Sequence, residues 1–160
     1  RVHLAHFTDL NAFKRCASSM LNTAHTPIVV MPWYPHDNNH PGKKNILDLC
    51  DRLPELALID KQARLATYNS SLARFRQPRF PVINVRYFSG VAGLNILAAA
   101  GVKHVRTLGI DGGNGYSTSF SKSSLLTNGR KDFDIQFKEI ERTVRKYKLD
   151  FAPMPTPKSD

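Results

Sequence analysis

Residues 82–110 contain a strand, helix and strand in succession, and this pattern restricts the fold more than any other part of the chain. The run 82–87 is rich in β-favouring apolar residues, which is typical of a buried parallel strand. A helix of small residues is predicted over 91–100, with Gly101 as its left-handed stop, and a second strand over 102–110. Such a unit has a right-handed crossover, and its ligands bind beyond the carboxyl ends of the strands.

Polar turns follow both strands of this unit. Ser89 and Gly90 stand at the amino end of the predicted helix, where unpaired backbone N–H groups and the helix dipole favour a phosphate. The second strand leads into a glycine-rich loop over 111–119 that carries carboxylate, amide and hydroxyl groups. Simpler interpretations are an N-cap for Ser89 and a solvated turn for the loop. We expect the two turns to meet at one cleft that holds a phosphorylated ligand.

The order of these motifs resembles the nucleotide-sugar site of small bacterial sialyltransferases that have a single Rossmann-type domain. It is also similar to motility-accessory-factor and pterin diphosphokinase-like domains, which share the serine-glycine turn and a strand ending in Gly-x-Asp, here 109–111. The similarity extends over residues 81–155, through an amphipathic helix and a terminal strand that ends at Pro153. The resemblance implies a bacterial glycosyltransferase-like enzyme that moves a sugar from a nucleotide-activated donor to a glycan or small-molecule acceptor.

The resemblance also implies roles for individual residues. Ser89 and Gly90 would meet the nucleotide, and Tyr116 would donate to the leaving phosphate as the glycosidic bond breaks. Tyr116 and Asp111 are therefore the predicted catalytic residues. The sugar-nucleotide cleft would be lined by the loop residues Asp111, Gly112, Gly113 and Asn114.

Two features of the sialyltransferase pattern are missing from this sequence. A histidine before the last helix is proposed to take the acceptor proton in that family, and here the segment 128–130 reads Asn-Gly-Arg. The base is therefore left open among the histidines of the chain. The phosphate loop that follows the first strand of the family is also absent, and the chain begins at Arg1, so upstream elements could be lacking.

Two other functions stay open at this point. A diphosphate-transferring enzyme of the pterin type would need ATP and Mg²⁺ held by carboxylates, of which Asp111 is the only well-placed one. A non-catalytic domain would keep nucleotide binding without turnover. No cofactor is firmly implied, and no metal site is expected, because prolines flank the loop in which His36, Asp37 and His40 would have to join Asp111 as ligands.

The chain carries 23 Lys and Arg against 13 Asp and Glu, a formal net charge of +10, which attracts phosphorylated ligands. Specific nucleic-acid binding is not expected, because the basic residues are scattered and no zinc-finger or RNA-recognition motif is present. The basic connection 68–79 could meet phosphate or face water. A loop after the predicted strand 28–31 could bring Trp33 and Tyr34 to an acceptor or a base, or use them only as rim aromatics.

The length of 160 residues suits one domain, predicted over 1–155 with a tail at 156–160. Strands near residues 2, 28, 57, 82, 105 and 150, with helices between them and one at 61–68, predict a single Rossmann-like, mostly parallel, doubly wound α/β sheet flanked by helices. No apolar run approaches the ~20 residues of a membrane span. No signal peptide is visible, and Cys16 and Cys50 suggest free thiols in the cytoplasm. The oligomeric state is left open.

Overall fold

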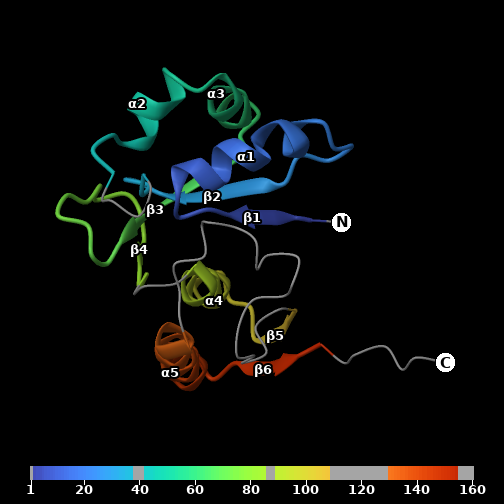
Figure 1. Ribbon diagram of the computed structural model, residues 1–160, viewed down its shortest axis with the longest axis vertical. Helices are drawn as coiled ribbons and strands as arrows, with labels where there is room; N and C mark the ends of the chain where they lie inside the picture. The colour runs from blue at the N-terminus through green and yellow to red at the C-terminus, as the bar shows by residue number, and fades with distance from the viewer. Residues whose placement is uncertain (1, 38–41, 86–88, 109–129, 155–160) are drawn as a thin grey trace. The chain divides into compact units, whose positions relative to one another are not determined.

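The computed structural model describes residues 2–37, 42–85, 89–108 and 130–154, which form an α/β structure with parallel strands (Figure 1). Contacts along the chain group it into two compact units, Arg1–Val85 and Arg86–Asp160. We call them the N-terminal and the C-terminal unit and describe each by itself. The prediction of one domain over residues 1–155 stays a prediction.

The N-terminal unit contains a four-stranded parallel sheet in the order β1-β2-β3-β4. The strands and helices follow along the chain as β1 (Leu4–His6), α1 (Leu10–Leu21), β2 (Ile28–Pro32), α2 (Ile46–Cys50), α3 (Pro54–Lys61), β3 (Leu65–Ser70) and β4 (Val82–Ile83). Right-handed crossovers between sequential strands place the connecting helices on one face. Figure 1 shows α1, α2 and α3 on the same side of this sheet. Because the four strands are parallel, their carboxyl ends all lie at the same edge of the sheet.

Helix α1 shows how the local sequence fixes this arrangement. Asp9 caps it, because its Oδ1 accepts hydrogen bonds from the backbone N–H groups of Asn11 at 2.9 Å and Ala12 at 3.1 Å. Its apolar face packs into the core as the helical spacing predicts. The buried core of the unit consists of Leu10, Phe13, Ala17, Val29, Met31, Trp33, Ile46, Leu49, Leu56 and Ile59.

Two predicted elements of this unit were wrong, and they are neighbours. The expected strand around 56–59 is helix α3, which has Pro54 in its first turn and buries Leu56 and Ile59, three positions apart. The second half of the helix expected over 61–68 is the start of strand β3, which pairs with β2 on one side and β4 on the other. The turn between them is made at Ala63, whose φ of 53° is a left-handed conformation that usually requires glycine.

The C-terminal unit pairs two parallel strands beneath two helices: α4 (Ser89–Ala99), β5 (His104–Thr107), α5 (Arg130–Tyr147) and β6 (Asp150–Pro153). Its buried core joins Val91 and Leu94 of α4 to Val105 and Ile140. The helix predicted over 91–100 and the strand predicted over 102–110 are confirmed as α4 and β5, and Gly101 ends α4 with a φ of 85°. Among the described residues, β5 pairs with β6 while β4 belongs to the four-stranded sheet, so the two strands of the predicted strand-helix-strand unit do not share one sheet. None of the helices in the described part of the chain is both long and apolar enough to cross a bilayer.

Candidate functional site

The predicted site divides between described and undescribed residues. Asp111, Gly112, Gly113, Asn114 and Tyr116 lie outside the residues that the structure describes. Ser89 and Gly90 are the first two residues of α4, and the side chain of Ser89 is exposed. The meeting of the serine-led and aspartate-led turns therefore stays a prediction.

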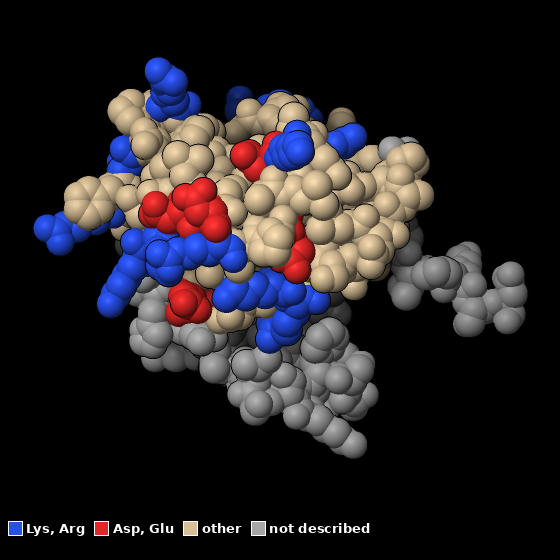
Figure 2. All heavy atoms as spheres, turned by 90° about the horizontal axis from the view of Figure 1, so that it is seen from above, with Lys and Arg blue, Asp and Glu red and all other residues tan. Residues whose placement is uncertain are grey.

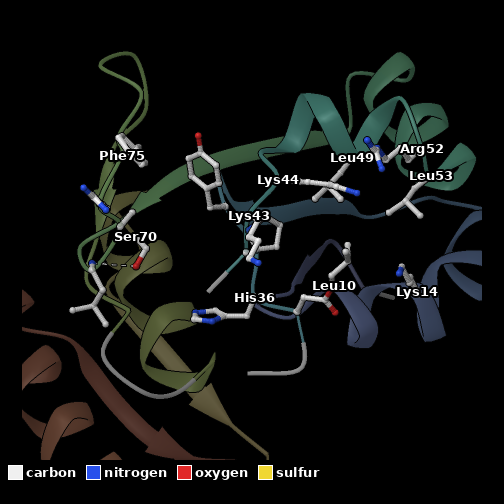
Figure 3. A pocket seen from close by; sticks show the side chains of 17 residues that line it. Leu10, Lys14, His36, Lys43, Lys44, Leu49, Arg52, Leu53, Ser70 and Phe75 are labelled. Carbon is white, nitrogen blue, oxygen red and sulfur yellow. Dashed lines mark hydrogen bonds between the residues drawn. The ribbon is translucent and has the colours of Figure 1, made fainter. Parts of the chain in front are cut away.

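The N-terminal unit contains a cleft of about 1460 Å³ beyond the carboxyl ends of β2 and β3, the edge at which parallel α/β sheets bind ligands (Figure 3). Four segments line it: α1, the loop from the end of β2 to the start of α2, the end of α2, and the loop after β3. The lining residues are Leu10, Lys14, Tyr34, Pro35, His36, Asp37, Gly42, Lys43, Lys44, Leu49, Arg52, Leu53, Ser70, Leu72, Ala73, Arg74 and Phe75.

Cations dominate the charge of this cleft. Its lining includes five Lys or Arg side chains and one carboxylate, that of Asp37, which accepts a hydrogen bond from Asn11 Nδ2 at 3.1 Å. Within the described part of the chain, none of the five forms an ion pair. Like charges that line a common concavity concentrate anions there. The five cations are Lys14, Lys43, Lys44, Arg52 and Arg74.

Positive charge is not confined to the cleft. On the face drawn in Figure 2, Lys and Arg side chains form several groups, with acidic side chains among them. A test of the cleft therefore needs a control lysine outside it. Lys61, at the end of α3, is exposed and does not line the cleft.

The backbone that carries Lys43 and Lys44 is fixed at both ends. At Gly42, a Cβ atom would overlap the carbonyl oxygen of Pro35, so this close approach requires glycine. On the other side, Asn45 caps α2 in a capping box, in which Asn45 Oδ1 accepts from Asp48 N at 3.1 Å while the Asp48 carboxylate accepts from Asn45 N at 3.3 Å. The two lysines thus have a defined origin on the cleft wall, although their side chains are exposed.

His36 supplies an imidazole to the same cleft. Its backbone N–H donates to Thr8 O and its carbonyl accepts from Leu10 N, both at 2.8 Å, which ties the loop after β2 to the start of α1. Its Nδ1 is buried and has no hydrogen-bond partner among the described residues. In Figure 3 the His36 ring lies in the lower half of the picture, below Lys43. His36 is the one histidine of the described residues that lines the cleft.

The loop after β3 is held by a buried amide. Asn69, only 1% exposed, donates from Nδ2 to the carbonyls of Gln77 at 2.7 Å and Phe80 at 2.8 Å. Its Oδ1 accepts from Gln77 N at 2.8 Å. At the start of the loop, the Leu72 N–H donates to Ser70 Oγ at 3.2 Å. These bonds shape the segment that contributes Leu72, Arg74 and Phe75 to the cleft.

Trp33 and Tyr34, the two aromatic residues noted in the loop after β2, lie in different environments. Trp33 is buried in the core and packs against Phe80 with ring centroids 5.2 Å apart, so it is neither the ligand contact nor the rim aromatic that the sequence left open for it. Tyr34 is half-buried and lines the cleft.

A hydrogen-bonded pair of side chains links β1 to β3, where His6 Nε2 and the Tyr68 hydroxyl lie 2.9 Å apart. Burial raises the pKa of Tyr68, so this phenol stays protonated.

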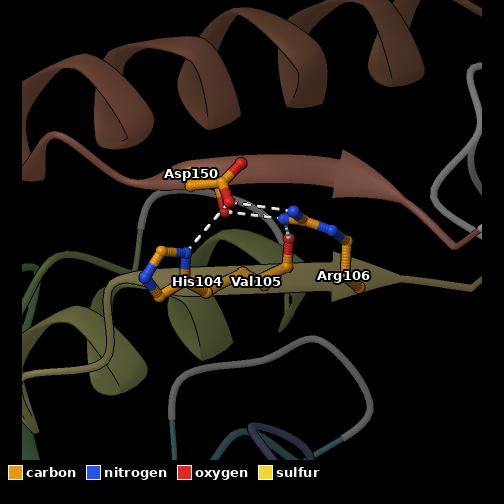
Figure 4. Close-up of polar contacts among 4 residues, drawn as sticks. All are labelled: His104, Val105, Arg106 and Asp150. Atoms are coloured by element: carbon orange, nitrogen blue, oxygen red, sulfur yellow. Dashed lines mark hydrogen bonds and ion pairs between the residues drawn. The ribbon is translucent and has the colours of Figure 1, made fainter.

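The C-terminal unit carries an exposed cluster on its two strands (Figure 4). The Asp150 carboxylate accepts from Arg106 Nη2 at 2.8 Å and lies 2.9 Å from His104 Nδ1. The hydrogen bond from Arg106, with a further contribution from His104, lowers the pKa of Asp150 to about 2. The cluster joins β5 to β6, and none of its residues lines the cleft of the N-terminal unit.

Sequence reasoning found parts of the cleft without its geometry. It identified the polar loop after β2 and the basic connection 68–79, which contains Arg74. Both segments contribute residues to the lining of the cleft. It missed Lys14, Lys43, Lys44 and Arg52, since only the strand order brings these segments together. Among the described residues no three His, Cys, Asp or Glu side chains are grouped in a way that could hold a metal ion. His40 and Asp111 lie outside those residues.

Comparisons of this chain with protein-family models, with curated proteins and with solved structures found no match.

Proposed function

We propose that this chain is a glycosyltransferase-like enzyme that binds the phosphates of a nucleotide-activated sugar in the cleft of its N-terminal unit. The observation that carries the proposal is the set of five cations, free of ion pairs with described residues, at the carboxyl edge of a parallel sheet. A single doubly wound Rossmann-like sheet, a bacterial source and a cytoplasmic location belong to the same proposal, on the strength of the resemblance.

The charge of the ligand supports the proposal. A sugar nucleotide carries negative charge on its phosphate or diphosphate, and lysine or arginine side chains pair with phosphate oxygens through charge-assisted hydrogen bonds. Each exposed pair contributes little by itself, about 0–1 kcal/mol, and salt screens it. Several cations around one concavity act together, so we expect affinity that falls steadily with added salt.

His36 is the proposed proton acceptor. The resemblance leaves the base unassigned, and a base is defined by its position near the reacting hydroxyl. His36 lines the cleft with a buried ring nitrogen, whereas His6 is bonded to Tyr68 and His104 lies beside Asp150. The catalytic roles predicted for Tyr116 and Asp111 rest on the resemblance alone, and this proposal does not place those residues in the cleft. His36→Gln should lower sugar-transfer turnover strongly while changing donor affinity by less than about twofold.

The proposal is tested by titrating the 160-residue chain with CMP, UDP, GDP and ATP, the last with and without Mg²⁺, by calorimetry. We expect binding of one sugar-carrier nucleotide, weakened at least fivefold by Lys43→Gln with Lys44→Gln. The control Lys61→Gln removes a positive charge outside the cleft and should leave affinity unchanged. An equal loss in the control would mean that general surface charge binds the nucleotide.

Other outcomes would replace the proposed activity. Tight binding of ATP only with Mg²⁺ would favour the diphosphotransferase. Nucleotide binding without sugar transfer, including with a longer chain, would favour a binding domain. Salt-sensitive affinity for DNA or RNA above that for any nucleotide would contradict all three.

A further inference from the structure

One wall of the cleft is apolar and exposed. Leu72 and Phe75 are each 64% exposed, and both line the cleft in the loop after β3. An exposed apolar side chain alone is ordinary on a protein surface. Here two of them stand three positions apart on a loop that faces a cationic cavity. We call residues 72–75 the apolar wall.

A cation already lies against the aromatic ring of this wall. The guanidinium carbon of Arg74 lies 5.5 Å from the centroid of the Phe75 ring, within the range of a cation–π contact. An exposed phenyl ring beside a guanidinium is a combination on which bases stack, because every base has a flat π face. The wall therefore suits an aromatic ligand group better than a hydroxyl-covered sugar.

Hydrogen bonds on both sides of the wall hold its backbone in place. The three hydrogen bonds of buried Asn69 hold residues 77 and 80, and Arg76 Nη2 donates to Ser71 O at 2.6 Å. These two sets of hydrogen bonds lie on either side of residues 72–75 along the chain. A wall that is held in this way binds a ligand with a smaller loss of conformational entropy than a loop that must be ordered.

Four of the five cations, Lys14, Lys43, Lys44 and Arg52, come from segments of the cleft other than the wall, to which Arg74 belongs. In Figure 3, Phe75 and Ser70 lie at one end, Lys43 is near the middle, and Arg52 and Lys14 are at the other end. A ligand that uses both regions must have a flat apolar group joined to an anionic group. Nucleotides have this chemistry, whereas sugar phosphates and inorganic diphosphate have only the anionic part.

We propose that the apolar wall is the base-binding subsite of this cleft, with the base stacked on Phe75 and the phosphates directed to Lys43 and Lys44. This inference rests on the proposed function and deepens it by assigning a residue to the nucleotide base. Recognition through a ring face is tolerant of the identity of the base, so Phe75 determines that a nucleotide binds more than which nucleotide binds.

The experiment compares two ligands on the full chain. The first ligand is whichever of UDP, CDP, GDP and ADP binds tightest, and the second is inorganic pyrophosphate, which lacks the base. Phe75→Leu removes the ring while keeping an apolar side chain, and Phe75→Tyr keeps the ring. Leu47→Ala changes a 60% exposed leucine of α2 that does not line the cleft. All these positions are exposed, so melting temperatures should be unchanged, which excludes misfolding.

The expected result separates the contribution of the ring from that of the lysines. Phe75→Leu should weaken nucleotide binding roughly tenfold and leave pyrophosphate binding unchanged, since stacking is lost. Lys43→Gln with Lys44→Gln should weaken both ligands. Phe75→Tyr and Leu47→Ala should leave both affinities within about twofold of the unmodified chain.

Failures of the inference and of the proposed function are distinguishable. Unchanged nucleotide affinity in Phe75→Leu, with the lysine effect intact, overturns the base subsite and leaves the phosphate site standing. Absence of nucleotide binding, or no lysine effect on either ligand, overturns both. An oligothymidine that binds more tightly than any mononucleotide, with the same dependence on Phe75, assigns the wall to single-stranded nucleic acid and overturns the inference.

Discussion

The loop after β3 and the strand pair of the C-terminal unit each carry a small polar network, and the two networks differ in burial. Asn69 makes its three hydrogen bonds while 1% exposed. The Asp150 side chain is 49% exposed, and its partners Arg106 and His104 are also open to solvent. Water competes for every bond of the second network and for very few of the first.

Because of this difference in burial, the two networks contribute differently to the stability of the backbone around them. A buried amide whose partners are backbone groups fixes the course of a loop, because breaking the bonds leaves polar atoms without water. An exposed ion pair adds little to folding, because its charges are hydrated when it opens. The buried hydrogen bonds of Asn69 therefore restrict the conformation of the apolar wall. The Asp150 cluster, by contrast, lies on two strands that already pair through their backbones, so it adds little to their stability.

The largest effect should come from Asn69→Ala. Removing the amide leaves the Gln77 N–H and the Phe80 carbonyl without the Asn69 partner, whereas the Gln77 carbonyl still accepts from the Phe80 N–H, so we expect a loss of about 2–3 kcal/mol in the free energy of unfolding. Urea denaturation measures it. Nucleotide affinity should fall as well, because the wall is no longer preformed.

Asn84→Ala is the matched control for Asn69→Ala. Asn84 is exposed, and its Oδ1 accepts one hydrogen bond, from Ser71 Oγ at 3.2 Å in the same loop region. A surface substitution of this kind should change stability by less than about 0.5 kcal/mol. Equal losses in the two variants would show that burial of the amide is not what holds the loop.

Asn95→Ala tests whether burial has the same effect in the C-terminal unit. Asn95 of α4 is buried and donates from Nδ2 to Thr143 Oγ1 of α5 at 3.2 Å and to Val91 O at 2.9 Å. Fewer backbone groups lose a partner than with Asn69, because the Val91 carbonyl lies within its own helix and Thr143 still donates to Glu139 O. We expect a loss of about 1–2 kcal/mol in urea denaturation. A loss larger than that of Asn69→Ala would reverse the proposed ranking.

Much of the fold could be predicted from sequence where the local signals agreed. Helix α1 has an apolar face and a capping aspartate, and α4 ends at a glycine with positive φ. The exchange of helix and strand at α3 and β3 has a physical cause. Leu56 to Ile59 are four consecutive apolar residues, a run that also suits a buried strand, and Ala63 makes the left-handed turn that glycine normally signals.

The candidate site was less predictable because its residues meet only through topology. Lys14, Lys43, Arg52 and Arg74 come from separate segments, and one of these follows the strand that the sequence did not reveal. Tyr34 and Trp33 are adjacent in sequence, yet one lines the cleft and the other packs into the core. Which of two neighbouring aromatics reaches solvent depends on the packing partner, here Phe80 for Trp33, which local sequence does not specify.

The smallest effect is expected at Asp150. Its pKa is lowered to about 2 from the usual 3.8 by Arg106 and then by His104, so the folded state favours the charged carboxylate. The resulting stabilisation is complete above the unfolded pKa and is lost as the pH falls from about 4 to about 2. Because the cluster is exposed, Asp150→Asn should leave the urea midpoint at pH 7 within experimental scatter. Carboxyl titration by NMR should place the Asp150 pKa near 2 and return it toward its usual value in Arg106→Gln. A pKa that does not move in Arg106→Gln, or a clear loss of stability in Asp150→Asn, would mean that this exposed network carries weight comparable to the buried one.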